Sequence, residues 1–357
     1  MSSPDFTEFY RNKKVVVTGA AGTVGTELVR QLQRLPVQEV RLLDNHEGTL
    51  FFLDEELKDD ARVQPFLCDV RSPDKLTTLL MGMDLVFHAA AAKHVPLCER
   101  SPFEAVQTNV NGVQNVIQAA QRNGVEKLLF TSSDKAVNPT NVMGTSKLMG
   151  ERLITAANAV QDTGRNTICA STRFGNVAGS QGSVIPLFCR QIAKGGPLTL
   201  TDPGMTRFMM SLEEAVRLVL ESMALACGGE VFVTKMPVMT IRDLGEVLVE
   251  MVAPLYGIDP ASVAIEEIGA RPGEKLYEEL VSGEEIRRTS ELDDLFVVQP
   301  AFPNIYGNVT YAYPGPTPQP ISRVYNSSSE TVMSHDAIRR FLTKEGILPE
   351  SVRDRLE

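Results

Sequence analysis

The sequence predicts an α/β fold in which a doubly wound parallel sheet precedes a smaller C-terminal lobe. Three features of the 357 residues support this fold class. Short β-branched runs alternate with segments of helical periodicity, a glycine-rich turn closes the first run, and the alternation ends after Asn176. Strands that alternate with helices form βαβ units, and such units build a parallel sheet covered by helices.

The first half of the chain supplies the elements of this sheet. Residues 15–17 form a β-branched run typical of a buried parallel strand, and residues 26–35 have apolar side chains at helical spacing. Further strands are expected at 40–43, 63–67, 84–92, 127–132 and 167–174, and further helices at 102–123 and 144–158. The helix at 102–123 is expected to bury one apolar stripe, formed by Val106, Val110, Val113, Val116 and Ile117.

The second half is less regular. Residues 179–204 are rich in Gly, Pro, Ser and Thr, which predicts loops with one short helix. Beyond them, helices are expected at 213–226, 241–252 and 335–345, a strand at 231–234, and a Pro/Tyr-rich loop at 300–320. The break in the pattern predicts a separate lobe.

Composition narrows the class of protein. The chain is 43% hydrophobic and 22% charged, which is ordinary for a soluble globular protein, and its net charge of −10 argues against nucleic acid as a partner. No apolar run is long enough to span a membrane, and the polar N-terminus resembles no secretory signal. Five scattered cysteines without a CxxC pair predict neither disulfides nor a metal site, so a cytoplasmic location is expected.

The glycine-rich turn predicts a bound dinucleotide. It lies between the first strand and the first helix, where glycine permits a tight turn and a close approach of the backbone to a pyrophosphate. Free N–H groups and the positive end of the helix favour such an anion. The residues of this turn that are expected to contact the dinucleotide are Gly19, Ala21, Gly22, Thr23, Val24 and Gly25.

Acidic residues after the next two strands refine the cofactor. Asp44 follows Gly25 by 19 positions, where a carboxylate accepts hydrogen bonds from ribose hydroxyls and repels a 2′-phosphate. NAD is therefore expected rather than NADP. Asp69 either meets the adenine edge or caps a helix, and the sequence leaves both readings open. The predicted cofactor site also takes in Asn45 and Val70 beside these acids, and the small residues Ala89, Ala90 and Ala91 after the fourth strand.

Motifs along nearly the whole chain carry a family resemblance. The most specific run is Ser133-Asp134-Lys135-Ala136-Val137-Asn138-Pro139, followed by Met143-Gly144-Thr145-Ser146-Lys147. Further matching segments are 92–96, 173–177, 182–186, 201–209 and 271–275. On these residues the chain resembles the extended short-chain dehydrogenase/reductases and, more narrowly, the UDP-N-acetylglucosamine 4,6-dehydratases of bacterial surface-sugar synthesis.

The resemblance implies a dehydration that uses NAD as a hydride store. In that chemistry the sugar C4 hydroxyl is oxidised, water leaves across C5–C6, and the hydride returns to C6. Elimination needs an acid and a base, and the adjacent Asp134 and Lys135 can supply both. By resemblance Asp134 is the acid and Lys135 the base, while Lys147 binds the nicotinamide ribose and stabilises nearby oxyanions.

Met143 departs from the superfamily pattern. A Tyr usually stands four positions before the active-site Lys, and methionine cannot take the C4 hydroxyl proton from the sugar. We interpret Met143 as the mark of a subfamily, with loss of activity as the alternative. Asp134, Ser133 or water must then handle this proton, and the sequence does not choose among them.

The resemblance also implies a UDP-sugar site. Lys93 is expected at the nicotinamide and sugar, and His94 either joins it or packs at a helix start. Asn176, Arg207 and Arg271 stand at positions that contact the nucleotide, because Arg suits phosphate. Glu274 either accepts from ribose hydroxyls or pairs with Arg271. Ser183, Val184, Thr201 and Met205 complete the predicted substrate site.

These expectations define a domain plan and its alternatives. A Rossmann-type NAD-binding domain is expected at 1–178, with 212–240 returning to it, and a nucleotide-sugar lobe at 179–211 and 241–345. A homo-oligomer is expected, with the helices at 96–123 as candidate interface, and retention of configuration at C5 is preferred. The alternatives are an epimerase or reductase on the same scaffold, or a non-catalytic NAD-sensing protein.

Overall fold

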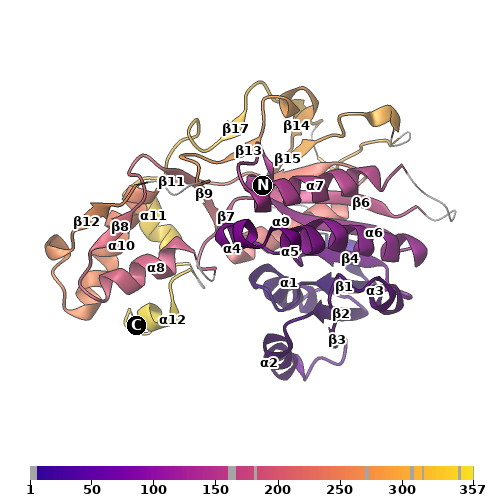
Figure 1. Ribbon diagram of the computed structural model, residues 1–357, viewed down its shortest axis with the longest axis horizontal. Helices are drawn as coiled ribbons and strands as arrows, with labels where there is room; N and C mark the ends of the chain where they lie inside the picture. Colours follow the sequence, from indigo (N-terminus) through magenta and orange to yellow (C-terminus); the bar gives the residue numbers. More distant parts are fainter. Residues whose placement is uncertain are drawn as a thin grey trace. The chain divides into compact units, whose positions relative to one another are not determined.

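The chain folds into two compact units in a computed structural model (Figure 1), which describes residues 6–159, 166–180, 183–269, 273–305, 309–315, 317–344 and 347–356. The first unit comprises Met1–Arg173, Val216–Lys235 and Val281–Val324. The second unit comprises Phe174–Ala215, Met236–Leu280 and Tyr325–Glu357.

A ten-stranded sheet forms the centre of the first unit. Its order is β16-β14-β15-β10-β6-β5-β4-β1-β2-β3. Pairing is parallel from β3 through β2, β1 and β4 to β5, and again between β6 and β10, so the expected doubly wound α/β sheet is confirmed. The strands are β1 (Lys14–Thr18), β2 (Glu39–Asp44), β3 (Val63–Leu67), β4 (Leu85–His88), β5 (Lys127–Ser133), β6 (Ile168–Phe174), β10 (Val231–Thr234), β14 (Thr289–Glu291), β15 (Leu295–Val298) and β16 (Gln319–Pro320).

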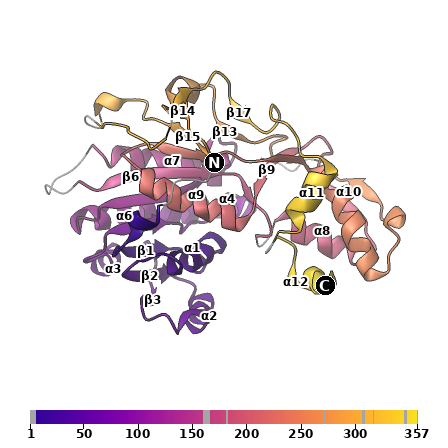
Figure 2. The same ribbon diagram turned by 180° about the vertical axis from the view of Figure 1, so that it is seen from behind.

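Helices cover this sheet on both faces. A buried apolar cluster joins the sheet to α3, α6 and α7, and the view from behind in Figure 2 shows α9 across the other face. The helices of this unit are α1 (Thr23–Gln33), α2 (Glu47–Leu57), α3 (Pro73–Leu79), α4 (Val95–Arg100), α5 (Pro102–Val106), α6 (Gly112–Arg122), α7 (Val142–Ala156) and α9 (Leu212–Leu225).

The helix expected at 102–123 is interrupted. A π-helical turn at Gln107–Asn111 separates α5 from α6. Val113, Val116 and Ile117 are buried as expected, but Val106 is 43% exposed. The wider π turn changes the angular register, so one apolar stripe does not run through the whole segment.

The second unit is built from short sheets and a helical core. A three-stranded sheet has the order β11-β9-β7, and two further pairs are β12-β8 and β13-β17. Buried apolar side chains join α8, α10, α11 and α12. The elements are β7 (Asn176–Val177), α8 (Val184–Ile192), β8 (Leu198–Leu200), β9 (Thr206–Met210), β11 (Val238–Thr240), α10 (Ile241–Val252), β12 (Ile265–Glu267), β13 (Glu279–Val281), β17 (Tyr325–Asn326), α11 (His335–Leu342) and α12 (Glu350–Arg353).

Three boundaries differ from the sequence-based expectation. Residues 281–324, expected in the smaller lobe, group with the first unit because β15 pairs with β10 and β14 pairs with β15. The strand expected at 84–92 ends at His88, and the residues after it form a loop. The last expected helix is shorter, since α11 ends at Leu342.

Candidate active site

The predicted cofactor and catalytic residues lie along one edge of the large sheet. The parallel strands β1, β2, β4 and β5 end at this edge. The glycine turn follows β1, Asp44 ends β2, Ala89 follows β4, and Ser133 ends β5. Ligands of open parallel sheets bind beyond the carboxyl ends of the strands. The fold of this unit thus collects residues that are more than 100 positions apart in the sequence.

Two glycines of the turn, Gly19 and Gly25, leave no room for a Cβ atom. Gly19 has a φ of 72°, and a Cβ atom on it would lie 2.5 Å from the backbone nitrogen of Ala90. A Cβ on Gly25 would lie 2.1 Å from the carbonyl oxygen of Gly19. Gly22 is the N-cap of α1, which begins at Thr23 and continues through Val24. The turn therefore brings β4, β1 and the positive end of α1 together at a backbone surface suited to a diphosphate.

Asp44 is bound to this turn. Its Oδ2 atom accepts a hydrogen bond from the backbone N–H of Ala21 at 2.9 Å, and its Oδ1 atom accepts one from His46 at 2.9 Å. A carboxylate held beside the turn suits ribose hydroxyls and repels a phosphate at the same place. The glycines, the helix N-terminus and this acid together fit NAD.

Asp69 is engaged in an ion pair. Its carboxylate accepts from Arg71 at 2.6 Å, and the Asn45 amide nitrogen lies 3.4 Å from it. The hydrogen bond from Arg71 holds the pKa of Asp69 below its usual value. The N-cap of α3 is Ser72, so Asp69 does not cap that helix. Val70 packs on α6, because a Cβ on Gly112 would lie 2.8 Å from its side chain.

The centre of the candidate active site is a 3₁₀ turn at Asp134–Ala136. The Ser133 hydroxyl donates to Asp134 Oδ1 at 2.6 Å, and Lys135 Nζ lies 3.1 and 3.0 Å from the two Asp134 oxygens. Asp134 is only 4% exposed, whereas the Lys135 side chain is 34% exposed. A hydroxyl, a carboxyl and an amine are therefore in direct contact, as proton transfer requires.

Helix α7 fixes the position of this turn. A Cβ on Gly144 would lie 2.2 Å from the carbonyl oxygen of Lys135, so only glycine lets the helix approach so closely. Asn141 caps α7, because its side chain accepts from the Gly144 N–H at 2.8 Å. The fit of turn and helix sets where Asp134 and Lys135 lie.

Met143 and Lys147 occupy different surroundings on α7. Met143 is buried in a small apolar cluster with Cys98 and Ala105. Lys147 is also buried, where its Nζ donates to the carbonyl of Thr131 at 2.9 Å and stands 4.5 Å from the centre of the Phe130 ring. Burial lowers the pKa of Lys147 to about 8.

A second buried basic group lies at the end of β4. His88 is fully buried, its Nδ1 atom is 2.7 Å from the Thr18 hydroxyl, and its ring centre is 5.6 Å from that of Phe130. Burial, with a smaller effect from the nearby charge of Lys147, lowers the pKa of His88 to about 3. His88 is therefore neutral at ordinary pH.

Asn109, which lies in the π turn, is a site residue that the sequence alone does not reveal. Its Oδ1 atom accepts from the Ala92 N–H at 2.8 Å, and its Nδ2 atom donates to the Ala92 carbonyl and to the Ser146 hydroxyl, both at 2.9 Å. Asn109 thus ties the loop after β4 to α7. An amide within an otherwise apolar helical stripe was the signal in the sequence that could have pointed to Asn109.

The loop after β4 carries two predicted substrate residues, Lys93 and His94, and both are exposed. Partial desolvation lowers the pKa of Lys93. His94 is the N-cap residue of α4.

Three predicted substrate residues of the second unit, Asn176, Arg207 and Glu274, lie close together. Glu278, which was not predicted, binds the first two. The buried Glu278 accepts from Asn176 Nδ2 at 2.8 Å and from the Phe208 N–H at 3.0 Å, and its Oε1 atom lies 3.3 Å from Arg207 Nε. Arg207 also lies 3.8 Å from Glu274. A buried acid next to an Arg and an Asn was not visible as one group in the sequence, because Glu278 is 102 positions from Asn176.

The remaining substrate residues occupy structural positions within this unit. Ser183 is the N-cap of α8 and Val184 is its first residue. The Thr201 hydroxyl lies 3.5 Å from the sulfur of the buried Met205, which belongs to the core. Arg271, and with it the alternative pair with Glu274, lies outside the described residues.

A match to a known family supports this interpretation of the site. Residues 15–300 match the family described as polysaccharide biosynthesis protein. The chain belongs to this family. It is an extended short-chain dehydrogenase/reductase, and thus an NAD-dependent enzyme that modifies a nucleotide sugar.

Three relatives show how similar this chain is to other proteins. The chain is 47% identical over 338 residues to the "uncharacterized membrane protein" MJ1061 of Methanocaldococcus jannaschii, covering 95% of this chain and 97% of the relative. It is 44% identical to CapD of Staphylococcus aureus, covering 77% of this chain but only 46% of CapD. A UDP-glucose 4-epimerase of Rickettsia massiliae is 39% identical, with 80% and 82% covered. No helix among the described residues of this chain is long and apolar enough to cross a membrane.

Two solved structures support the fold. Pen from Bacillus thuringiensis is 40% identical with a TM-score of 0.85, over 94% of this chain and 98% of Pen. DesIV from Streptomyces venezuelae, a dTDP-glucose 4,6-dehydratase with NAD and TYD bound, is 25% identical with a TM-score of 0.65, over 77% and 90%.

Proposed function

We propose that the protein is a UDP-N-acetylglucosamine 4,6-dehydratase that retains the configuration at C5. The product is a UDP-4-keto-6-deoxy-HexNAc, made in the cytoplasm for surface glycans or for nonulosonic or deoxyamino sugars. The observation that carries the proposal is the contact of Ser133, Asp134 and Lys135 within one turn. Dehydration needs an acid and a base at neighbouring carbons, and this turn offers both.

The cofactor would lie along the sheet edge described above. The glycine turn would hold the diphosphate, Asp44 the adenosine ribose, and Lys147 the nicotinamide ribose. When bound, NAD supplies a hydride acceptor for C4 and later a hydride donor for C6. Every other step falls to side chains of the protein.

The proton of the C4 hydroxyl has a path that avoids Met143. Methionine has no group that accepts a proton, and this one is buried among apolar side chains. Ser133 can take the proton while its own hydroxyl proton passes to Asp134 Oδ1 along their 2.6 Å hydrogen bond. Oxidation at C4 thereby turns Asp134 into the protonated acid that the next step requires.

Elimination then uses both members of the pair. Once Asp134 is protonated it no longer stabilises the ammonium form of Lys135, and the partly exposed amine releases one proton to solvent. Neutral Lys135 then removes the C5 proton, which the C4 ketone has made acidic, and Asp134 gives its proton to the departing C6 hydroxyl. Water leaves, and Asp134 and Lys135 are again a carboxylate and an ammonium group, 3.0 Å apart as in the structure. Lys135 returns its proton to C5 when C6 is reduced and regains one proton from solvent. Proton and hydride counts balance, and one amine acting on one face retains the C5 configuration.

Mass spectrometry tests this proposal directly. The purified protein is incubated with UDP-N-acetylglucosamine and NAD⁺, and the nucleotide sugar is expected to lose one water. In D₂O, the product is expected to carry deuterium at C5 with the original configuration. Lys135→Met should abolish water loss but leave NAD⁺ binding intact, whereas the exposed Lys58→Met serves as the matched control. Turnover by Lys135→Met at the wild-type rate would remove Lys135 from the mechanism.

A 4-epimerase is the second candidate, because the Rickettsia relatives carry that name. Epimerisation conserves the mass of the sugar nucleotide and makes no use of an acid at C6. The same incubation separates the two reactions: an unchanged mass with a new C4 epimer would replace the dehydratase proposal. NAD⁺ binding without any change in the sugar would favour a sensing role.

We also propose that the chain forms a homo-oligomer through α4, α5 and α7. Large apolar side chains are exposed on these helices: Leu97 is 58% exposed, Phe103 83% and Met149 50%. The three helices contact one another, and exposed apolar side chains on neighbouring helices are typical of a protein interface. Light scattering should find an oligomer for the wild type and a smaller species for Phe103→Asp; an unchanged mass would exclude this surface.

A further inference from the structure

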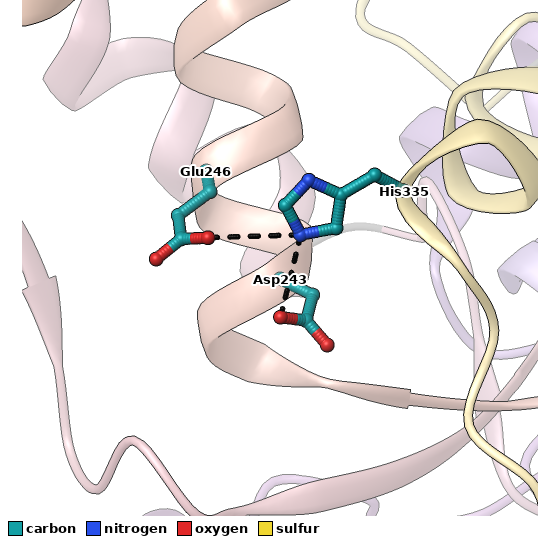
Figure 3. Close-up of side chains that lie close together, drawn as sticks. All are labelled: Asp243, Glu246 and His335. Carbon is teal, nitrogen blue, oxygen red and sulfur yellow. Dashed lines mark hydrogen bonds and ion pairs between the residues drawn. The ribbon is translucent and has the colours of Figure 1, made fainter.

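Two helices of the second unit present three metal-ligand side chains to one point (Figure 3). Asp243 and Glu246 lie three residues apart on α10, and His335 is the first residue of α11. One ligand atom from each residue lies within 4.8 Å of the other two. The close-up shows His335 Nε2 directed at both carboxylates, with its other ring nitrogen turned away from them.

The distances within this cluster are long for hydrogen bonds. His335 Nε2 lies 3.4 Å from Asp243 Oδ1 and 3.6 Å from Glu246 Oε2. A good N–H···O bond measures about 2.9 Å, and a single N–H cannot point at two acceptors equally well. A tetrahedral ion with ligand bonds of about 2.0–2.1 Å holds its ligand atoms about 3.4 Å apart. The spacing is that of two edges of a coordination tetrahedron.

The charges of the cluster call for a cation. Within the described residues, no Lys or Arg forms an ion pair with Asp243. Arg242 Nε binds the Oε1 atom of Glu246 at 2.8 Å, which leaves Oε2 directed at His335. Two carboxylates and an imidazole nitrogen therefore converge on one point, and Arg242 binds the Glu246 oxygen that does not face His335. The geometry points to a divalent metal site, and we propose Zn²⁺ as its ion, with water as the fourth ligand.

The packing around the cluster preorganises these ligands. Thr240 caps α10 by accepting from the Asp243 N–H at 2.9 Å, and the Ser334 hydroxyl caps α11. Ile338 and Phe341 of α11 belong to the same buried core as Leu244 of α10. Because this core fixes the two helices against each other, a metal ion would meet ligands that are already in place.

The chemistry of the ligands selects the ion. One imidazole nitrogen and two carboxylate oxygens suit Zn²⁺ better than Mg²⁺ or Ca²⁺, which prefer all-oxygen sites. Thiols do not compete, because burial raises the pKa of all five cysteines, from Cys68 to Cys227. Among the described residues no second such group of His, Cys, Asp or Glu occurs. One ion per chain is therefore expected, tying α11 to α10.

Metal binding by the full-length, tag-free chain tests the proposal without any activity assay. The protein is dialysed against micromolar Zn²⁺, its metal content is measured by mass spectrometry, and its melting temperature is recorded with and without the ion. We expect one bound Zn²⁺ per chain and a rise of a few degrees in melting temperature. Co²⁺ should give the strong visible absorption of a four-coordinate site.

Variants at the half-buried ligand positions locate the site. His335→Gln and Asp243→Asn should each weaken Zn²⁺ binding at least tenfold and abolish the shift in melting temperature. Asp336→Asn is the matched control, since this neighbouring acid is 78% exposed and pairs with Arg339 instead. Absence of saturable Zn²⁺ binding in the wild type, or equal binding by His335→Gln, would overturn the proposal. Either result leaves the dehydratase proposal untouched.

Discussion

The Gly144→Ala substitution tests whether close contact with α7 sets the position of the Asp134–Ala136 turn. The new Cβ would lie 2.2 Å from the carbonyl oxygen of Lys135, whereas ordinary contacts measure 3.4–4 Å. The turn must therefore move by about 1 Å, and a displacement of that size costs roughly 10²-fold in rate when it misplaces a reacting group. Alanine itself favours the helix, so the loss should come from the turn and not from α7.

Two measurements check this expectation. The rate of water loss from UDP-N-acetylglucosamine, followed by mass spectrometry, should fall about 10²-fold, while NAD⁺ affinity from calorimetry stays close to wild type. Gly48→Ala is the matched control, because Gly48 is exposed on α2 and its new Cβ would come no closer than 3.9 Å to another residue. An unchanged rate for Gly144→Ala would refute the claim that this contact positions Asp134 and Lys135.

Three further changes test other parts of the site. Glu278→Gln should raise KM for the UDP-sugar about tenfold with little change in kcat, because Glu278 orients Arg207 and Asn176 by charge; an unchanged KM would contradict this role. Asp44→Asn should weaken NAD⁺ binding about tenfold in calorimetry and reduce the ratio of NAD⁺ affinity to NADP⁺ affinity. A variant that still rejects NADP⁺ as strongly as the wild type would speak against Asp44 as the source of cofactor specificity. The pKa of His88 in the folded chain, about 3, lies below the ordinary value of 6.5. As pH falls from 6.5 to 5, only the unfolded chain therefore gains a proton at this residue. The free energy of unfolding should drop by about 2 kcal/mol over that window. Urea titrations should find this loss missing from His88→Gln, and parallel pH profiles would refute it.

The positions of the parallel strands along the chain could be predicted from local patterns alone. Val15–Val17 and the glycines after them follow from β-branching and from the needs of a tight turn, and both depend on neighbours in the chain. The π turn at Gln107–Asn111 could not be predicted in this way. Its widened backbone is stabilised by bonds from Asn109 to Ala92 and Ser146, which become neighbours only in the folded unit.

The same reason explains which site residues were found. Because Ser133, Asp134 and Lys135 are adjacent in sequence, their possible role in proton transfer could be predicted before the fold was known. Glu278 was missed because a carboxylate in a run of charged residues usually indicates a solvated surface. Only the fold buries it against Asn176 and Arg207, where its charge has a function. Likewise, residues 281–324 carry short apolar strands, and no local signal assigns them to a sheet that begins at residue 14.

In the proposed dehydration, the replacement of the usual tyrosine changes what Asp134 must do. With a Tyr at position 143, the proton from the C4 hydroxyl would leave by way of the phenol, and Asp134 would need a proton from elsewhere before water could depart. With Met143 buried beside Cys98, the 2.6 Å bond between Ser133 and Asp134 becomes the available route. The proton released by oxidation is then the proton consumed in forming water. On this reasoning the methionine couples the two half-reactions, and Ser133→Ala should slow C4 oxidation and water loss together, as a single-turnover experiment that follows both would reveal.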